Sequence, residues 1–547
     1  MADEVPNTGI PLPEGSSDII QTDYEIGQDN FEAQVGPFGL DIHNPVFLIS
    51  GLSIVLFVFY ALVFQEQASE VFGALRPWLT RTFDWFFLSA ANVFVLFCLV
   101  LIVTPYGNVR LGGAEASPDY TYLGWFAMLF AAGMGIGLMF FGVLEPVYHM
   151  AISEPLGVPA PFDADGNVIA ANVDAAREMG LAATIYHWGL HPWAIYAIVA
   201  LALALFSYNK GLPLTIRSAF YPIFGERVWG WTGHIIDTLA VFATLFGLAT
   251  SLGFGAQQAA AGLEFVYGIP NTINVQVLLI TGITAVALVS VLRGLDGGVK
   301  VLSELNMGLA ALLLIFVLLV GPTLAILTGF GEGLIAYVRD VVPLSNPVGR
   351  EDDGYRQGWT AFYWAWWISW SPFVGMFIAR VSRGRTVREF IVCVLLIPSL
   401  VCVLWMAVFG GTAIDQVFAS PETSLVKANV IDSYSPELSL FGMLADLPFA
   451  AVTSTLGIIL VVVFFVTSSD SGSLVIDTIT AGGKVDAPVP QRVFWCIFEG
   501  AVAIVLLLGG GLGALQAMVI STGLPFTLVL LLMCWAIFKG LQSERRA

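Results

Sequence analysis

Aromatic side chains are concentrated in one uncharged stretch of the sequence, FYWAWWISWSPF at 362–373, which contains four tryptophans. A second stretch, HWGLHPWAIY at 187–196, places Trp188, Trp193 and Tyr196 within about two turns of helix. The face of an aromatic ring attracts cations, and each ring contributes roughly 0.5–2 kcal/mol. These clusters therefore predict a cage for a quaternary cation. Aromatic packing in the core is the alternative interpretation.

Residues that weaken helices lie close to these rings. The stretch AAGMGIGLMFFG at 131–142 contains Gly133, Gly135 and Gly137, and Ser369–Pro372 lies within the tryptophan-rich stretch. Glycine costs a helix about 1 kcal/mol and proline about 3 kcal/mol. Inside lipid, the freed backbone groups must line a cavity or be buried in protein. We therefore expect both segments to depart from regular helix at a binding site, with a GxxxG packing face as the alternative for the glycines.

The charge of the substrate can be inferred from the same residues. No Asp or Glu stands among these aromatic residues in the sequence, so nothing there would neutralise a lone cation. This favours a zwitterion. Its carboxylate could meet backbone N–H groups at the unwound glycines.

The elements that carry these residues are predicted to cross a membrane. Of 547 residues, 57% are hydrophobic and 12% are charged, whereas about a quarter are charged in soluble proteins. Apolar runs long enough to cross about 30 Å of hydrocarbon recur from Pro45 almost to the end. We predict an all-α membrane protein with twelve transmembrane helices. The predicted spans are 45–64, 84–104, 122–145, 180–208, 235–262, 274–293, 305–329, 358–380, 389–413, 447–478, 491–512 and 515–538.

The distribution of charge predicts the orientation. Lys and Arg gather in the segments that are inside if both termini are cytoplasmic. Residues 1–44 contain acidic side chains and no Lys or Arg, which is typical of a disordered tail. EGLIAYVRDVV at 332–342 predicts an amphipathic helix at the outer surface. The predicted divisions are an acidic cytoplasmic tail at 1–44, two peripheral transmembrane helices at 45–121, a five-helix repeat at 122–329, a surface helix and loop at 330–357, a second five-helix repeat at 358–538 and a short tail at 539–547.

Other kinds of site are not indicated. His187 and His191 have the i, i+4 spacing of metal ligands, but no carboxylate accompanies them, so we predict no zinc site. The chain has no GxxxxGK[ST] or GxGxxG motif, and its acidic charge argues against nucleic acid as a partner. The five cysteines lie in apolar runs without CxxC spacing and are predicted to be packing residues. We expect neither an enzyme nor an organic cofactor.

Four stretches together resemble a known family. GMGIGLMFFGVLEP, HWGLHPWAIY, FYWAWWISWSPFVGMFIARVSRGRTVREFI and FFVTSSDSGS, in this order, resemble the betaine/choline/carnitine transporter family. The resemblance covers essentially every predicted span. It implies two peripheral helices followed by a five-plus-five inverted repeat of the leucine-transporter type, in a homotrimer. The implied substrate-binding residues are Trp188, Trp193, Tyr196, Trp367, Ala132, Gly133, Gly135 and Gly137, and those of the substrate pathway are Phe362, Trp366 and Trp370.

Hydroxyl groups in span 10 suggest a coupling ion. Thr467 and Ser468 interrupt a run of Val and Phe, and hard oxygen donors suit sodium, although such hydroxyls often bond back to their own helix. The resemblance implies a sodium site made by carbonyls of Ala131, Met134 and Phe464 with these two side chains. It implies a possible second sodium at Thr244 and Phe373. There the sequence departs from the family, because Leu248 stands where a second threonine is expected.

The expected function is import of a zwitterionic quaternary-ammonium or sulfonium osmolyte, such as glycine betaine or dimethylsulfoniopropionate, by sodium symport across the cell inner membrane. A sodium-independent or proton-coupled carrier of choline or carnitine is the alternative within the family. Sodium-independent exchangers commonly carry an arginine in span 5, and VFATLFGLATSLGFGAQQ has none, which favours symport. A receptor or channel that only binds such a ligand is the alternative outside it.

Overall fold

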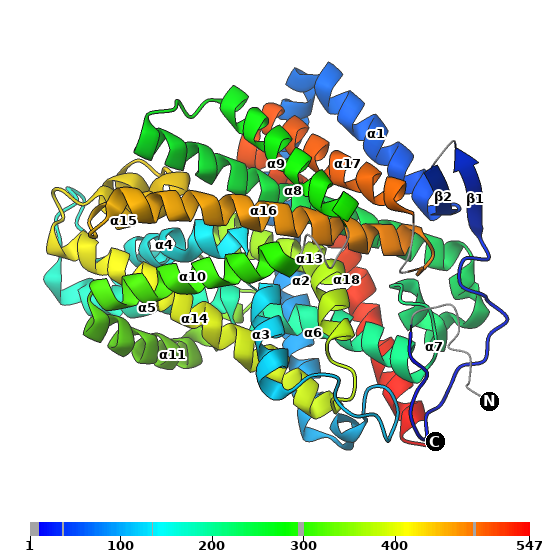
Figure 1. Cartoon of the computed structure of the whole chain (residues 1–547). Coiled ribbons are helices and arrows are strands. Elements are labelled where there is room, and N and C mark those ends of the chain that lie inside the picture. The colour runs from blue at the N-terminus through cyan, green and yellow to red at the C-terminus, as the bar shows by residue number, and fades with distance from the viewer. Residues whose placement is uncertain (1–9, 36–37, 134, 294–299, 485–487, 547) are drawn as a thin grey trace.

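The structure is a computed structural model of the chain and describes residues 10–35, 38–133, 135–293, 300–484 and 488–546. Most of these residues form helices that lie alongside or across one another, and one hairpin lies at the edge of the body (Figure 1). The strands and helices are β1 (Asn30–Val35), β2 (Phe38–His43), α1 (Val46–Val63), α2 (Gln65–Val103), α3 (Tyr122–Gly133), α4 (Ile136–Ala151), α5 (Val173–Trp188), α6 (Leu190–Ala204), α7 (Tyr221–Phe224), α8 (Trp231–Tyr267), α9 (Ile273–Arg293), α10 (Lys300–Val320), α11 (Thr323–Ser345), α12 (Asp353–Tyr355), α13 (Ala361–Arg380), α14 (Val387–Ala419), α15 (Ser439–Ala445), α16 (Ala450–Thr480), α17 (Val489–Leu508) and α18 (Gly511–Glu544). Short 3-10 or π-helical segments are η1 (Pro105–Asn108), η2 (Glu154–Leu156), η3 (Ala170–Asn172), η4 (Leu205–Asn209), η5 (Arg217–Phe220), η6 (Gly225–Trp229), η8 (Arg356–Thr360), η9 (Lys427–Asp432) and η10 (Pro436–Leu438).

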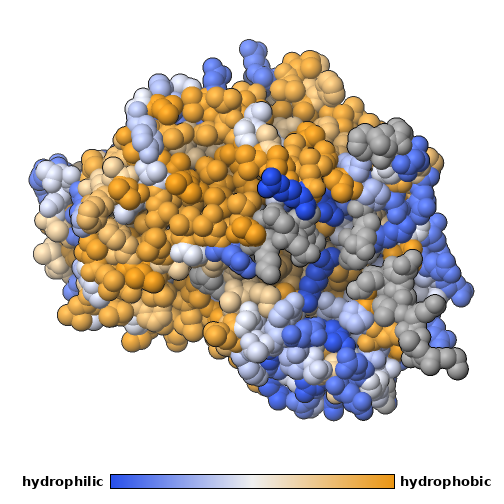
Figure 2. Space-filling view, in the orientation of Figure 1, coloured by the Kyte–Doolittle hydropathy of each residue, from blue (hydrophilic) through white to orange (hydrophobic). Residues whose placement is uncertain are grey.

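Ten helical stretches within the described residues are long and apolar enough to cross a membrane. Figure 2 shows hydrophobic side chains covering the middle of one face of the molecule, and hydrophilic side chains gathered at the end that carries β1 and β2. Leu278 of α9, Leu319 of α10 and Val452 of α16 are among the exposed apolar residues. An apolar surface of this extent is stable in lipid and not in water.

Two of the twelve predicted spans are not among these ten stretches. Residues 122–145 are divided between α3 and α4, each too short to cross a membrane alone. Residues 358–380 correspond to α13, which is rich in tryptophan and serine. The predicted span 84–104 is the second half of α2, which begins at Gln65. The number of twelve spans and their repeat relation stay predictions.

The turn between α10 and α11 comes earlier in the chain than the sequence predicts. α10 ends at Val320 and α11 begins at Thr323, so the predicted span 305–329 is wrong at its end. The predicted surface helix at 332–342 is part of α11, which has 23 residues. Pro322 cannot continue α10, and the hydroxyl of Thr323 donates to a carbonyl in its last turn at 2.6 Å. The apolar run continues across this turn, so hydropathy alone did not mark it.

A serine replaces the hydrogen bond that Pro372 removes from α13. The prediction of a break at Ser369–Pro372 is wrong, because α13 continues as one helix through this point. Pro372 has no N–H for the carbonyl of Ile368, four residues earlier. The hydroxyl of Ser371 donates to that carbonyl at 2.6 Å instead. α13 therefore presents its aromatic side chains along an unbroken helix.

The described residues from 10 to 43, here called the N-terminal arm, fold against the helices. β1 and β2 form an antiparallel hairpin. Tyr24 stacks on Trp229 with ring centroids 4.3 Å apart, and Arg217 donates to the Tyr24 hydroxyl at 2.7 Å. Burial raises the pKa of Tyr24 to about 12. The expectation of a disordered tail is therefore wrong for the arm.

Ion pairs explain why an acidic segment folds here. The bases that pair with the arm follow α6, α13 and α16, far along the chain. The pairs are Asp18 with Lys210, Glu14 with Arg383, and Asp41 and Glu32 with Lys484. The hydrogen bond from Lys210 lowers the pKa of Asp18 below its usual value. Composition predicted disorder because these partners are distant in sequence.

We predict that Tyr24→Ala lowers the midpoint of thermal unfolding of the purified protein by several degrees. Removal of a largely buried aromatic ring costs about 3 kcal/mol in well-packed sites, and Arg217 also loses a partner. Phe31→Ala is the control, because the Phe31 side chain is 58% exposed. If both variants unfold with the wild-type midpoint, the stack on Trp229 does not hold the arm.

Candidate functional site

A break separates α3 from α4, as the sequence predicted. α3 ends at Gly133 after Ala132, α4 begins at Ile136, and Gly135 between them has extended backbone (φ −170°, ψ −171°). Met134 lies outside the described residues. No side chain caps α4, and the first N–H groups of a helix have no partner within it. The start of α4 therefore offers N–H groups and a partial positive charge to an anion.

The four side chains predicted to form a cage lie together. The ring of Trp367 on α13 has its centroid 5.3 Å from that of Trp188, 5.1 Å from that of Tyr196 and 6.3 Å from that of Trp193. All four residues are buried. Trp188 is the last residue of α5, and the other two lie in the first two turns of α6. The interruption at Gly189 separates α5 from α6 and brings these rings to one side.

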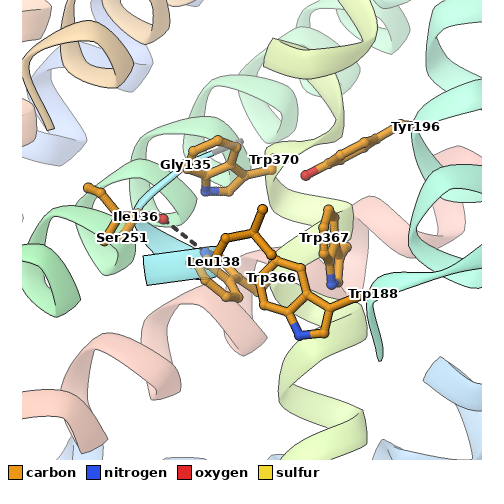
Figure 3. Close-up of a pocket in the computed structure, with 10 residues that line it drawn as sticks. Gly135, Ile136, Leu138, Trp188, Tyr196, Ser251, Trp366, Trp367 and Trp370 are labelled. Atoms are coloured by element: carbon orange, nitrogen blue, oxygen red, sulfur yellow. Dashed lines mark hydrogen bonds between the residues drawn. The ribbon is translucent and has the colours of Figure 1, made fainter. Parts of the chain in front are cut away.

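A cavity lies between three of these rings, those of Trp188, Tyr196 and Trp367, and the start of α4 (Figure 3). Its walls are Gly135, Ile136, Gly137, Leu138, Trp188, Tyr196, Ser251, Trp366, Trp367 and Trp370. Aromatic rings and the first residues of α4 thus border the same space, as a cation with an attached carboxylate requires. The sequence reasoning missed Ile136 and Leu138, since aliphatic residues beside glycine resemble ordinary membrane-facing residues.

The predicted pathway residues follow one another along α13 at intervals of four. Phe362 stacks on Trp366 with ring centroids 5.6 Å apart, and Trp366 contacts Trp370 edge to face. The indole N–H of Trp366 donates to the hydroxyl of Ser251 at 3.1 Å (Figure 3). Trp366 and Trp370 line the cavity, and Phe362 lies one turn away. Their role in substrate movement stays a prediction.

Gly137 allows α4 to approach the rings closely. A Cβ atom at this position would lie 2.8 Å from Cη2 of Trp188 and 3.0 Å from Cη2 of Trp366. Both distances are shorter than van der Waals contact. Gly137 is therefore a packing glycine, but the side chains packed against it are those that border the cavity.

A buried carboxylate that the sequence reasoning missed lies behind Trp188. Glu145 of α4 is fully buried, and its Oε2 accepts from Trp188 Nε1 at 2.7 Å and from the Tyr363 hydroxyl at 2.5 Å. Acids are absent among the aromatic residues along the sequence, but α4 brings one to them in space. The signal was the stretch GVLEP, since an ionisable residue inside an apolar run is a candidate functional residue by default.

The two histidines with metal-ligand spacing face different partners. His187 Nδ1 lies 2.5 Å from Glu145 Oε1, and His191 Nε2 lies 3.0 Å from Asn92 Oδ1 of α2. A third histidine, His149 of α4, lies 3.2 Å from the same Glu145 oxygen. Glu145 thus contacts both His149 and His187, whereas His191 contacts Asn92.

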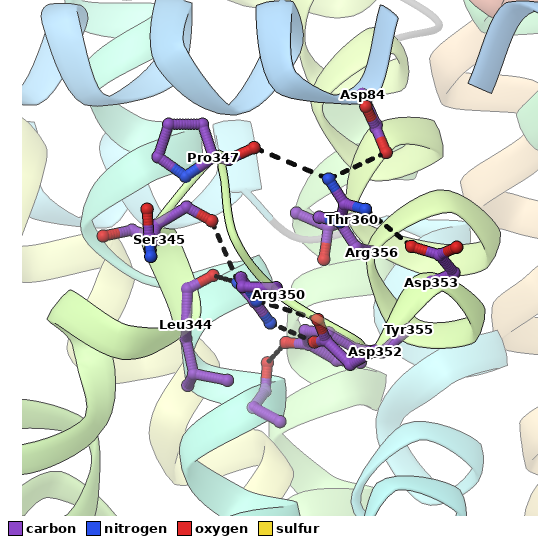
Figure 4. A network of polar contacts seen from close by, with 12 residues as sticks. Asp84, Leu344, Ser345, Pro347, Arg350, Asp352, Asp353, Tyr355, Arg356 and Thr360 are labelled. Atoms are coloured by element: carbon purple, nitrogen blue, oxygen red, sulfur yellow. Dashed lines mark hydrogen bonds and ion pairs between the residues drawn. The ribbon is translucent and has the colours of Figure 1, made fainter. Parts of the chain in front are cut away.

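Ion pairs and hydrogen bonds hold the segment between α11 and α13 in place (Figure 4). Arg356 pairs with Asp84 of α2 at 3.1 Å, and the side chain of Arg350 donates to a carbonyl at the end of α11. Between them, Tyr355 stacks on the imidazole of His187 with centroids 5.1 Å apart. This segment therefore packs against His187, which is part of the group around Glu145.

The predicted sodium ligands of α16 lie in regular helix. The Thr467 hydroxyl donates to the carbonyls of Val463 and Phe464 at 3.0 and 3.2 Å, the back-bonding pattern that was the alternative interpretation. Ser468 is half-buried, and Ala131 lies in the last turns of α3. The sodium site stays a prediction.

The possible second sodium site has a leucine where a ligand is expected. Thr244 of α8 donates to the Ala240 carbonyl at 2.8 Å. Leu248, one turn later, packs closely against Gly472 of α16, where an added Cβ would lie 2.2 Å from its Cδ1. Phe373 is half-buried on α13. The leucine fills the space between two helices, and a second site also stays a prediction.

The comparison with protein families agrees with this geometry. The family described as BCCT, betaine/carnitine/choline family transporter, matches residues 45–546. The chain belongs to this family. As a member of the BCCT family, it is a multi-pass membrane transporter and not an enzyme.

Relatives of this BCCT transporter carry names of the same kind. It is 63% identical over 545 residues to a glycine betaine/proline/choline transporter of Vibrio parahaemolyticus, covering 99% of this chain and 97% of the relative. It is 43% identical over 495 residues to the glycine betaine transporter OpuD of Bacillus subtilis, covering 89% and 92%. Among solved structures, a manganese transporter of Eremococcus coleocola aligns over 75% of this chain and 78% of its own, at 13% identity and a TM-score of 0.40, which carries no argument.

We predict that Gly137→Ala abolishes most substrate uptake while the protein still reaches the membrane. The added methyl group would push Trp188 and Trp366 apart and change the shape of the cavity. Gly308→Ala is the matched control, since nothing lies within 4 Å of an added Cβ on this exposed part of α10. Wild-type uptake by both variants would show that the rings tolerate displacement and that this approach does not define the site.

Proposed function

We propose that this BCCT transporter is a sodium symporter that imports a zwitterionic osmolyte with a quaternary-ammonium or sulfonium group, such as glycine betaine or dimethylsulfoniopropionate. The observation that carries the proposal is the cavity bordered by Trp188, Tyr196 and Trp367 and by the start of α4. A trimethylammonium or dimethylsulfonium group has no N–H to donate, so ring faces suit it better than hydrogen-bond acceptors. The N–H groups of α4 suit the carboxylate.

The names of the relatives support a betaine-type substrate. Glycine betaine appears in the names of both the Vibrio parahaemolyticus and the Bacillus subtilis proteins, and choline and proline appear in the first. Glycine betaine and proline are zwitterions, and choline carries a quaternary ammonium group without a carboxylate. The ring faces would serve betaine and choline, and the start of α4 would serve betaine and proline.

Sodium coupling supplies the driving force in this proposal. A zwitterion has no net charge, so the membrane potential acts on the ion that accompanies it. One sodium ion contributes about 2.3 kcal/mol per 100 mV. The proposed ligands are carbonyls of Ala131, Met134 and Phe464 with the side chains of Thr467 and Ser468, and Leu248 argues against a second ion at Thr244. The alternative is a sodium-independent or proton-coupled carrier of choline or carnitine.

The proposed setting is the cell inner membrane, with both termini in the cytoplasm and three copies assembled in lipid. Lys210, Arg383 and Lys484 follow α6, α13 and α16 on one side, together with the N-terminal arm that pairs with them. Their clustering supports a cytoplasmic location for this side by the positive-inside rule. The trimer rests on the family resemblance.

The proposal is tested by uptake into proteoliposomes that contain the purified protein. Labelled glycine betaine should accumulate above the external concentration with an inward sodium gradient and a negative interior, and should only equilibrate when sodium is replaced by potassium. Accumulation driven equally well by a proton gradient without sodium would support the alternative carrier. Binding without accumulation under any gradient would support a receptor.

We predict that Thr467→Ala raises the sodium concentration for half-maximal uptake about tenfold, because loss of one oxygen ligand costs roughly 1–2 kcal/mol. Thr453→Ala is the matched control, since the Thr453 hydroxyl also donates to the carbonyls three and four residues before it. A sodium dependence that is the same in both variants and in the wild type would remove Thr467 from the site.

A further inference from the structure

Glu145 is a buried acid whose hydrogen bonds within the described residues come from aromatic and imidazole groups. Its Oε2 accepts from Trp188 and Tyr363, and its Oε1 lies 2.5 Å from His187 Nδ1 and 3.2 Å from His149 Nε2. A carboxylate has about four lone-pair positions, so these contacts fill them. The group is a hydrogen-bonded anion enclosed by aromatic and imidazole groups.

The group holds a negative charge close to the cavity. Among the described residues, no Lys or Arg pairs with Glu145, whose ion-pair partners are the two histidines. His187 Nε2 lies 2.9 Å from the hydroxyl of Thr360, so a neutral His187 with its proton on Nδ1 satisfies both contacts. An ionised Glu145 beside this neutral His187 places a negative charge behind Trp188.

Trp188 connects this charge to the cavity. Its indole N–H points to Glu145, and its ring borders the cavity and contacts Trp367 edge to face, with 82° between the ring planes. A hydrogen bond from an indole N–H to a carboxylate fixes the ring orientation. It also pushes electron density into the ring, which strengthens the attraction of its face for a cation.

We propose that Glu145 is a positioning residue that orients and polarises Trp188 and thereby favours substrates with a positively charged head. The acid acts through the ring and does not touch the substrate. An acid in direct contact would repel the substrate's own carboxylate, whereas one behind Trp188 strengthens the cage from a distance. This inference rests on the proposed function, because it assumes that the cavity takes a quaternary-ammonium substrate.

The test separates substrate binding from turnover in proteoliposomes at saturating sodium. Glu145→Gln removes the charge with little change of volume, and it should raise KM for glycine betaine about tenfold with kcat changed much less, since loss of a charge-assisted hydrogen bond is an effect of that size. Glu145→Asp keeps the charge and should restore part of the affinity. Glu499→Gln is the control, because Glu499 is equally buried but accepts from Ser469 and not from a ring of the cavity.

A second pair of variants tests the same proposal if Glu145→Gln fails to fold. Trp188→Phe removes the indole N–H and should also raise KM, whereas Trp364→Phe removes an indole that neither meets a carboxylate nor lines the cavity, and should not. If Glu145 acts through the ring, adding Glu145→Gln to Trp188→Phe should raise KM further by less than twofold. A full tenfold increase on that background would overturn the proposal, because Glu145 would then act by another route.

Binding of glycine betaine to the wild type distinguishes failure of the proposed role of Glu145 from failure of the proposed function. It is measured by the shift in thermal unfolding on addition of glycine betaine. If the wild type binds and Glu145→Gln binds as tightly, the role of Glu145 is overturned and the proposed function stands. If the folded wild type neither binds nor transports glycine betaine, both are overturned.

Discussion

Polar groups inside the apolar body of this protein must find their partners within it, because lipid offers no hydrogen bonds. Two features create most of this demand near the cavity: the break between α3 and α4, and the buried carboxylate of Glu145. The break directs N–H groups of α4 toward the cavity. The carboxylate draws the polar edges of Trp188 and Tyr363 to itself, and the Trp188 ring also borders the cavity. The N–H edge and the ring of Trp188 thus serve different partners.

Trp188 bonds to Glu145 through its N–H edge and borders the cavity with its ring. This arrangement explains how the site can favour a positively charged head group and still admit a carboxylate. A cation held by ring faces loses little, since a quaternary ammonium group makes no hydrogen bonds to water that must be replaced. The negative charge of Glu145 lies behind Trp188 and is fully shielded from solvent. The first residues of α4 border the same cavity, where helix N–H groups suit a carboxylate. The two ends of the substrate are thus served by different helices.

The sequence predicted the cavity residues well because their types carry the chemistry. Of the four predicted cage rings, those of Trp188, Tyr196 and Trp367 line the cavity with the glycine break, and Trp193 packs against Trp367. The sequence could not predict contacts between distant elements. The Ser371 hydroxyl bonds to the carbonyl that Pro372 leaves without a partner, so α13 continues as one helix. Tyr24 stacks on Trp229 and holds an arm whose composition indicates disorder. Glu145 was overlooked because its ring partners are 43 and 218 residues away.

In the proposed function, the cavity recognises the positive charge of the substrate and not only its shape. This recognition of charge is tested most directly with 3,3-dimethylbutanoate, in which carbon replaces the nitrogen of glycine betaine and leaves size and carboxylate almost unchanged. Inhibition constants of both compounds are measured against uptake of labelled glycine betaine at saturating sodium. Unlabelled glycine betaine should inhibit at least about tenfold more strongly than the carbon analogue, since several ring faces each contribute roughly 0.5–2 kcal/mol to a cation. Equal inhibition by the two compounds would contradict the proposed recognition of charge.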